Sequence, residues 1–128
     1  HHLTACRPDI VGHLDIVSKL TGDGSLFDTR AAWYHSAEER LAQAAARSGC
    51  IVEVNTAGLR VQTRGEVYPS RHILTLLRRA GVPVIITADA HRPEDVAAGF
   101  AQAASLLRSL GFESTMILQG GRFVPLPL

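Results

Sequence analysis

The sequence has few cysteines and no long apolar run. No stretch approaches the roughly 20 consecutive apolar residues that span a bilayer, and no charged segment followed by an apolar one marks a signal peptide at the N-terminus. The two cysteines, Cys6 and Cys50, have neither metal-binding nor redox spacing. We therefore expect both to be reduced and packed in or near the core of a cytoplasmic protein that has no membrane partner.

An excess of charge of either sign is also absent. The chain has 13 Lys and Arg residues against 12 Asp and Glu residues, which gives a formal net charge of +1. Proteins that bind nucleic acid or anionic membranes usually carry a basic patch or stripe, which this sequence lacks. We therefore expect no nucleic-acid partner. A length of 128 residues suffices for one domain, or a part of one, with a modest core.

Short apolar segments alternate with amphipathic ones along the chain. Loops are expected at 21–25 and, in irregular form, at 61–69. The C-terminal strands form a pair around a tight turn at Gly120 and Gly121, and Pro125 and Pro127 are expected to stop further pairing. Strands are expected at residues 9–11, 50–54, 82–87, 114–118 and 122–124.

Three helices are expected between these strands, each with a start and a stop signal. The starts are a capping box of Ser36 and Glu39, a cap at Ser70 and a first-turn proline at Pro93, and the stops are Gly49, Gly81 and Gly111. The buried stripe of the third helix should include Val96. Strands and helices that alternate in this way predict an α/β fold, with parallel strands joined by right-handed crossovers.

Polar residues follow the expected carboxyl end of each parallel strand. In both barrels and open α/β sheets, these ends form the active face. Asp89 and His91 are spaced i, i+2, so they point to the same side of an extended segment. Taken alone, Asp89 could instead cap the next helix and His91 could be an ordinary surface residue. The recurrence at three strand ends favours a site built from His13 and Asp15, Asn55 and Arg60, and Asp89, His91 and Arg92.

The residue types at this face indicate a chemistry. Imidazole and carboxylate groups are metal ligands, and guanidinium groups offer forked donors that match phosphate oxygens. Arg92 also lies at the expected start of a helix, where the backbone favours anions. The alternative for each arginine is a solvated side chain or an ion pair with Glu66 or Glu94. A metal site beside anion-binding arginines suggests phosphoester hydrolysis.

Four linked segments make the sequence resemble a known family. They are Ile-Val-Gly-His-Leu-Asp at 10–15, Glu-Val-Asn-Thr-Ala-Gly-Leu-Arg at 53–60, Glu-Val-Tyr-Pro-Ser at 66–70 and Ala-Asp-Ala-His-Arg-Pro at 88–93. In this order and spacing they resemble the C-terminal half of the histidinol-phosphatases of the PHP (polymerase and histidinol phosphatase) family. The resemblance covers essentially the whole chain.

The resemblance implies a fold and an activity. That family forms a distorted, TIM-like β/α barrel of seven strands with a trinuclear centre of divalent metals (Zn, Mn or Fe), and it hydrolyses L-histidinol phosphate in histidine biosynthesis. Motif matching makes His13, Asp89 and His91 metal ligands, with Asp89 and His91 also catalytic. Ala88 stands where the family usually has serine. The residues expected to bind the small phosphate ester are Arg60, Arg92 and Asn55.

The length of the chain departs from the family pattern. The first family motif, His-x-Asp-x-His, and further His and Glu ligands lie N-terminal to anything present, and a barrel needs about twice this length. Residues 1–128 are therefore expected to be a partial domain that pairs with a missing N-terminal half of the barrel. The alternatives are another PHP-type phosphoesterase or nuclease-like domain, and a non-catalytic fragment that keeps the motifs.

Overall fold

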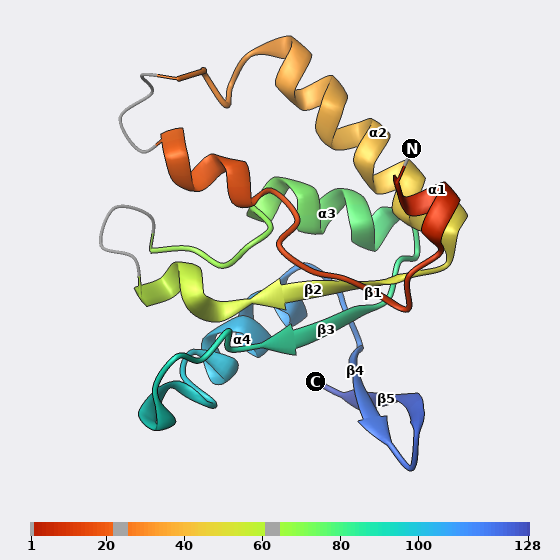
Figure 1. The fold of residues 1–128 in the computed structure, drawn as a ribbon, viewed down its shortest axis with the longest axis vertical. Coiled ribbons are helices and arrows are strands. Elements are labelled where there is room, and N and C mark those ends of the chain that lie inside the picture. The colour runs from red at the N-terminus through yellow and green to blue at the C-terminus, as the bar shows by residue number, and fades with distance from the viewer. Residues whose placement is uncertain (1, 22–25, 61–64) are drawn as a thin grey trace.

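The computed structural model describes residues 2–21, 26–60 and 65–128, in which helices and short strands alternate (Figure 1). The strands are β1 (Ile10–Val11), β2 (Ile51–Asn55), β3 (Val84–Thr87), β4 (Ser114–Gln119) and β5 (Arg122–Pro127). The α-helices are α1 (His2–Cys6), α2 (Ala32–Ser48), α3 (Arg71–Arg79) and α4 (Phe100–Ser109). The 3₁₀ helices are η1 (Ile16–Thr21), η2 (Thr56–Arg60) and η3 (Pro93–Asp95).

Strands β1, β2 and β3 form a parallel sheet in sequence order, which confirms the predicted α/β arrangement. Val52 pairs with Val11 on one side and with Val84 on the other. Residues that pair in this way point to the same face of the sheet. Residues 22–25 of the expected loop and 61–64 of the expected irregular segment lie outside the described residues. Residues 65–69 are irregular as predicted, apart from one isolated bridge between Tyr68 and Asn55. None of the helices described here reaches the length and hydrophobicity that crossing a bilayer requires.

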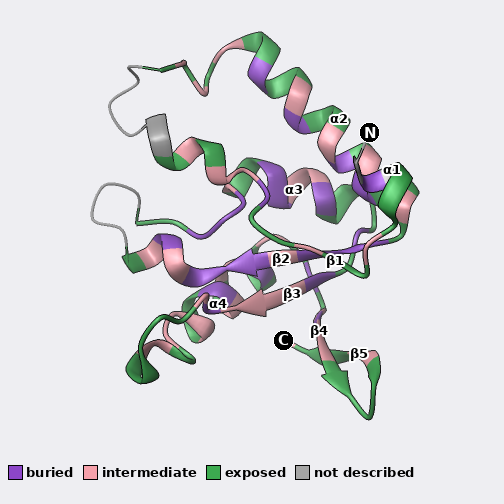
Figure 2. Cartoon of the chain, viewed as in Figure 1, coloured by how far each residue is buried: buried purple, intermediate pink, exposed green. Residues whose placement is uncertain are grey.

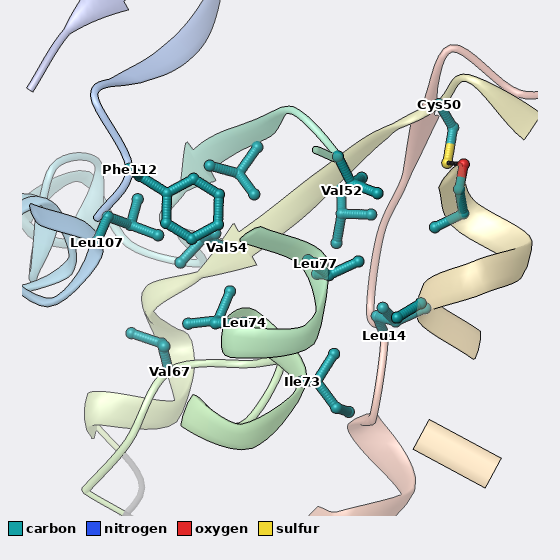
Figure 3. Close-up of a cluster of buried hydrophobic side chains, with 14 of the residues drawn as sticks. Leu14, Cys50, Val52, Val54, Val67, Ile73, Leu74, Leu77, Leu107 and Phe112 are labelled. Atoms are coloured by element: carbon teal, nitrogen blue, oxygen red, sulfur yellow. Dashed lines mark hydrogen bonds between the residues drawn. The ribbon is translucent and has the colours of Figure 1, made fainter. Parts of the chain in front are cut away.

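One face of this sheet packs against the helices. Val52, Val54 and Val84 lie in the hydrophobic core together with side chains of α2, α3 and α4, and Figure 3 shows several of them around Phe112 and Leu107. Figure 2 shows buried residues along β2 and within α2 and α3. The opposite face carries the alternate residues of β2, which include Glu53 and Asn55. The polar residues of the sheet therefore lie on the face away from the shared core.

The C-terminal strand pair is present, but its prolines were interpreted wrongly. Strands β4 and β5 are antiparallel, and Pro125 and Pro127 pair with Met116 and Ser114. The amide of Leu128 donates to the carbonyl of Glu113 beside β4. Backbone nitrogens alternate in direction along a strand, so those of Pro125 and Pro127 face away from β4. The prolines therefore cost no hydrogen bond within the pair.

Helix α2 begins earlier than the predicted capping box. Its first residue is Ala32, and Ala31 at the N-cap makes no side-chain capping bond. Aromatic packing holds this end of the helix, because the ring of Phe27 lies 5.7 Å from that of Trp33 and 5.3 Å from that of Tyr34. The prediction from Ser36 was wrong because these tertiary contacts outweigh the local capping signal. The predicted stop is confirmed, with Gly49 in the left-handed conformation at φ 71°.

The third predicted helix is divided in two. Residues 93–95 form η3 and α4 begins only at Phe100, while Gly99 between them has φ 80°. A side chain at Gly99 would be strained by this left-handed backbone, and its Cβ atom would lie 2.7 Å from Leu59 Cδ1 and 3.0 Å from Thr56 Cβ. Val96, expected on the buried stripe, is 64% exposed because the break turns it outward. Arg92 therefore precedes a single short turn and not a long helix.

The predictions for the cap of α3 and for Cys50 are confirmed, and the prediction for Cys6 is wrong. Ser70 caps α3 as expected, since its side-chain oxygen accepts a hydrogen bond from the amide of Ile73 at 3.4 Å. Cys50 is buried, which confirms its predicted place in the core. Cys6 is exposed, so the same prediction was wrong for it. It ends the short helix α1 and its neighbour Arg7 leads toward β1, which leaves it at the surface.

Candidate metal centre

The structure brings three of the predicted site residues together beyond the carboxyl ends of β1, β2 and β3. The Nε2 atom of His13 lies 3.5 Å from the Oδ2 atom of Asp89. The Nδ2 atom of Asn55 donates to the same Oδ2 atom at 3.3 Å. His13 follows β1, Asn55 ends β2 and Asp89 follows β3, so each comes from a different strand. The expectation that these strand ends converge is confirmed for these residues.

Glu53 is a further member of this group, which the residue pattern did not identify. Its Oε2 atom accepts the backbone N–H of His13 at 2.7 Å and lies 3.4 Å from the Nδ1 atom of that imidazole. Its Oε1 atom accepts the hydroxyl of Thr87 at 2.8 Å. One signal could have revealed it: Glu53 is an acidic residue inside an apolar strand, spaced i, i+2 from Asn55 and so on the same face.

The backbone at the same place is strained. His13, Asp15 and Asp89 have φ values of 56°, 66° and 49°, in the left-handed region that side chains other than glycine usually avoid. Such conformations cost of the order of 1–3 kcal/mol each and tend to occur at functional sites. Gly12 adds close packing, because a Cβ atom there would lie 3.2 Å from Glu53 Oε2. Arg7, before β1, shares this conformation at φ 42°, and two of the predicted ligands, His13 and Asp89, are among the four residues other than glycine that adopt it in the described parts of the chain.

His91 is exposed, and the left-handed backbone of Asp89 (φ 49°) means that the two residues do not lie in the extended segment from which their convergence was predicted. The Nδ1 atom of His91 lies 2.9 Å from the backbone carbonyl oxygen of Asp89. A carbonyl oxygen can only accept, so this contact is a hydrogen bond in the tautomer with the proton on Nδ1, and in that neutral tautomer Nε2 is the nitrogen with the lone pair. In His13 the Nδ1 atom likewise faces a carboxylate, that of Glu53, while Nε2 faces Asp89. Both histidines thus direct an Nε2 atom away from their supporting group.

Arg60 contacts the backbone of the segment that carries Asp89. Its Nη2 atom donates to the carbonyl oxygens of Ala88 at 2.8 Å and Asp89 at 3.2 Å, and its Nε atom lies 3.7 Å from Asp95 Oδ1. These contacts hold the backbone that carries Asp89. The expected alternative ion pair with Glu66 or Glu94 is therefore replaced by one with Asp95. Arg92 is exposed at the same rim.

Asp15 points away from the strand-end group and toward the helices. Its carboxylate accepts a hydrogen bond from the hydroxyl of Tyr34 on α2, and its Oδ2 atom accepts the backbone N–H of Ser70 at 3.3 Å. The i, i+2 spacing of His13 and Asp15 therefore does not bring them to one point, because both residues have left-handed backbone and are no longer in an extended segment. Asp15 connects the segment after β1 to α2 and α3.

Comparison with known proteins gives one informative similarity. No family model matches the chain. A protein named as a probable histidinol-phosphatase, from Deinococcus radiodurans, is 30% identical over 103 residues. The matched region is 80% of this chain and 36% of that protein, so the chain spans about a third of the length of this relative.

Proposed function

We propose that this chain is the C-terminal part of a metal-dependent phosphomonoesterase that hydrolyses L-histidinol phosphate to L-histidinol and phosphate. The similarity to a probable histidinol-phosphatase suggests a phosphatase, and the four sequence segments quoted above indicate the substrate. The observation that carries the proposal is the meeting of His13 Nε2 and Asp89 Oδ2, 3.5 Å apart, at the ends of two parallel strands.

The donor set at this point suits a divalent metal. Histidine ligands commonly donate their other ring nitrogen to a carboxylate or a backbone carbonyl, which fixes the tautomer. Glu53 occupies that place for His13, and the carbonyl of Asp89 occupies it for His91. Two ligand atoms bound tetrahedrally at about 2.0–2.1 Å from a zinc ion are separated by about 3.3 Å, close to the distance between His13 Nε2 and Asp89 Oδ2.

In this proposal His13, Asp89 and His91 hold divalent metals of the Zn, Mn or Fe type, with further ligands from the part of the protein outside this chain. Such metals supply Lewis acidity toward the phosphoryl oxygens and activate water. Asp89 and His91 are the catalytic residues that the chain contributes. Glu53 and Asn55 orient His13 and Asp89, and Arg60 fixes the backbone of Asp89.

The remaining predicted role is phosphate binding. Arg92 is exposed at the rim and is the best placed of the three predicted residues to contact a phosphate group. Arg60 and Asn55 already contact Asp89 and its carbonyl, so their contribution to substrate binding acts in part through that residue.

The arrangement of the layers supports a barrel as the complete fold. All three longer helices share one core with a single face of the sheet, and the strands lie in sequence order. In a β/α barrel the helices cover the outer face and the inner face is closed by the remaining strands. Ile10, on the inner face in this proposal, is 37% exposed. We propose that the N-terminal half of the barrel covers it.

The proposal is tested by phosphate release from L-histidinol phosphate in the full-length parent protein. Asp89→Asn should lower the turnover number at least about 100-fold, as loss of a metal ligand implies. Asp9→Asn, an exposed carboxylate before β1, is the matched control and should leave turnover unchanged. Near-normal activity of the Asp89 variant would contradict the assignment of Asp89 as a catalytic metal ligand. Release from other phosphoesters alone would favour another PHP-type phosphoesterase, and absence of bound metal would favour a non-catalytic fragment.

A further inference from the structure

A second group of ligand-type side chains lies between α2 and α3. It consists of His35 and Glu38 on α2 and His72 on α3, here called the helix-pair cluster. His35 and Glu38 are spaced i, i+3, so they lie on one face of their helix. One nitrogen or oxygen atom from each of the three residues lies within 4.8 Å of the others. The cluster shares no residue with the site at the strand ends.

The two imidazoles converge on one carboxylate oxygen. His35 Nδ1 lies 2.9 Å and His72 Nε2 lies 3.6 Å from the Oε2 atom of Glu38. The two rings have centroids 5.0 Å apart and meet edge to face at 62°. The separations lie on either side of the value of about 3.3 Å expected between ligand atoms of a tetrahedral zinc ion. The ligand atoms of the two histidines lie within 4.8 Å of one another, so movements of these side chains would be needed to place all three around one cation.

The burial of these residues differs in a way that suits a metal site. The side chain of Glu38 is only 6% exposed, whereas those of His35 and His72 are 46% and 50% exposed. The buried carboxylate already contacts the two imidazoles, and a cation between the rings would compensate its charge directly. The exposed histidine faces leave a route for the ion and room for a water ligand.

The carboxylate is also held by supporting hydrogen bonds. The hydroxyl of Ser70 donates to the second oxygen, Oε1, of Glu38 at 3.4 Å, and the backbone N–H of Ser70 donates to Asp15 at 3.3 Å. Carboxylates that ligate metals are usually oriented by such hydrogen bonds. The cluster is thus tied to Asp15, in the segment that follows β1, through one serine at the start of α3.

We propose that the helix-pair cluster binds one divalent cation of the zinc class and thereby fastens α2 to α3. Two imidazoles and one carboxylate are a donor set typical of Zn²⁺ with an open fourth position. This site is independent of the proposed phosphatase centre. Substitutions in the helix-pair cluster and substitutions in that centre should therefore each lower the number of bound metal equivalents, and the equivalents lost should be different ones.

The test uses Zn²⁺ alone as the probe, with metal content and affinity measured by equilibrium dialysis of the purified full-length protein. His72→Ala and Glu38→Gln should each lose one equivalent, or bind it at least about 100-fold more weakly. Glu39→Gln, a neighbouring exposed carboxylate on α2, is the matched control and should keep every equivalent. Asp89→Asn should keep the equivalent bound by the helix-pair cluster.

Thermal unfolding separates metal loss from misfolding. Zn²⁺ should raise the melting temperature of the Asp89→Asn and Glu39→Gln variants and raise it less in His72→Ala. Because the side chain of His72 is half exposed, its truncation leaves the core intact and decides the matter even if Glu38→Gln does not fold. The proposal is overturned if folded His72→Ala binds as many equivalents as the control with the same affinity, since the three residues then form only hydrogen bonds and ion pairs.

Discussion

The backbone N–H of His13 donates to the carboxylate of Glu53, 40 residues further along the chain, at 2.7 Å. This contact joins the segment after β1 to the middle of β2. The same carboxylate accepts the hydroxyl of Thr87 on β3, so one side chain connects all three parallel strands. It also faces the Nδ1 atom of His13, which leaves Nε2 directed at Asp89. The orientation of the predicted ligand thus depends on a residue that is not itself a predicted ligand.

Replacing Glu53 by Gln should therefore weaken metal binding without removing a ligand. The amide keeps one acceptor oxygen, but it loses the charge that favours the Nδ1-protonated form of His13. Changes to such supporting groups commonly lower metal affinity or activity by about 10–100-fold. Metal titration of the full-length protein, with Glu66→Gln as the exposed control, measures the effect. Equal affinities of the two variants would show that His13 is oriented without Glu53.

Replacing Arg60 by Ala should lower the turnover number more than it changes the Michaelis constant. The variant loses the charge-assisted hydrogen bonds to the carbonyl oxygens of Ala88 and Asp89, and it leaves Asp95 without this partner. We expect a loss of about 1–3 kcal/mol in the free energy of unfolding.

The matched comparison for Arg60 is Arg92→Ala at the exposed rim. Loss of Arg92 should raise the Michaelis constant for L-histidinol phosphate and leave stability nearly unchanged, because exposed side chains contribute little to it. Steady-state kinetics and denaturant unfolding together separate the two roles. If Arg60→Ala raises only the Michaelis constant, Arg60 binds phosphate directly and does not act through Asp89.

The features that could be predicted from the sequence were those set by local pattern. Polar residues after the predicted strands correctly indicated that His13, Asn55 and Asp89 lie at one edge of the sheet. The glycine at position 49 correctly predicted the end of α2. The features that could not be predicted arise from contacts between distant segments. Glu53 joins the site through residues 34 and 40 positions away, and Gly99, where the predicted helix is broken, packs closely against Leu59 and Thr56. A single sequence does not reveal such pairings.

Gly58 offers a test of the packing beneath the site, since it lies in η2 between Asn55 and Arg60. A Cβ atom on Gly58 would lie 2.1 Å from the backbone carbonyl oxygen of Glu66, far inside contact distance. Backbone cannot yield as a flexible side chain can, so Gly58→Ala must displace the segment that runs antiparallel to the end of β2. We expect it to cost about 3 kcal/mol or more of unfolding free energy.

The control for Gly58 is Gly49→Ala, at the end of α2. Gly49 has φ 71° and no atom within 4 Å of its Cβ position, so alanine there should cost only about 1–2 kcal/mol, for the left-handed backbone. Denaturant unfolding of both variants measures the difference. Equal costs would mean that the Glu66 carbonyl can move away freely. A larger cost at Gly58, with reduced turnover in the full-length protein, would show that the packing of η2 against this segment keeps Asn55 and Arg60 in place beside Asp89.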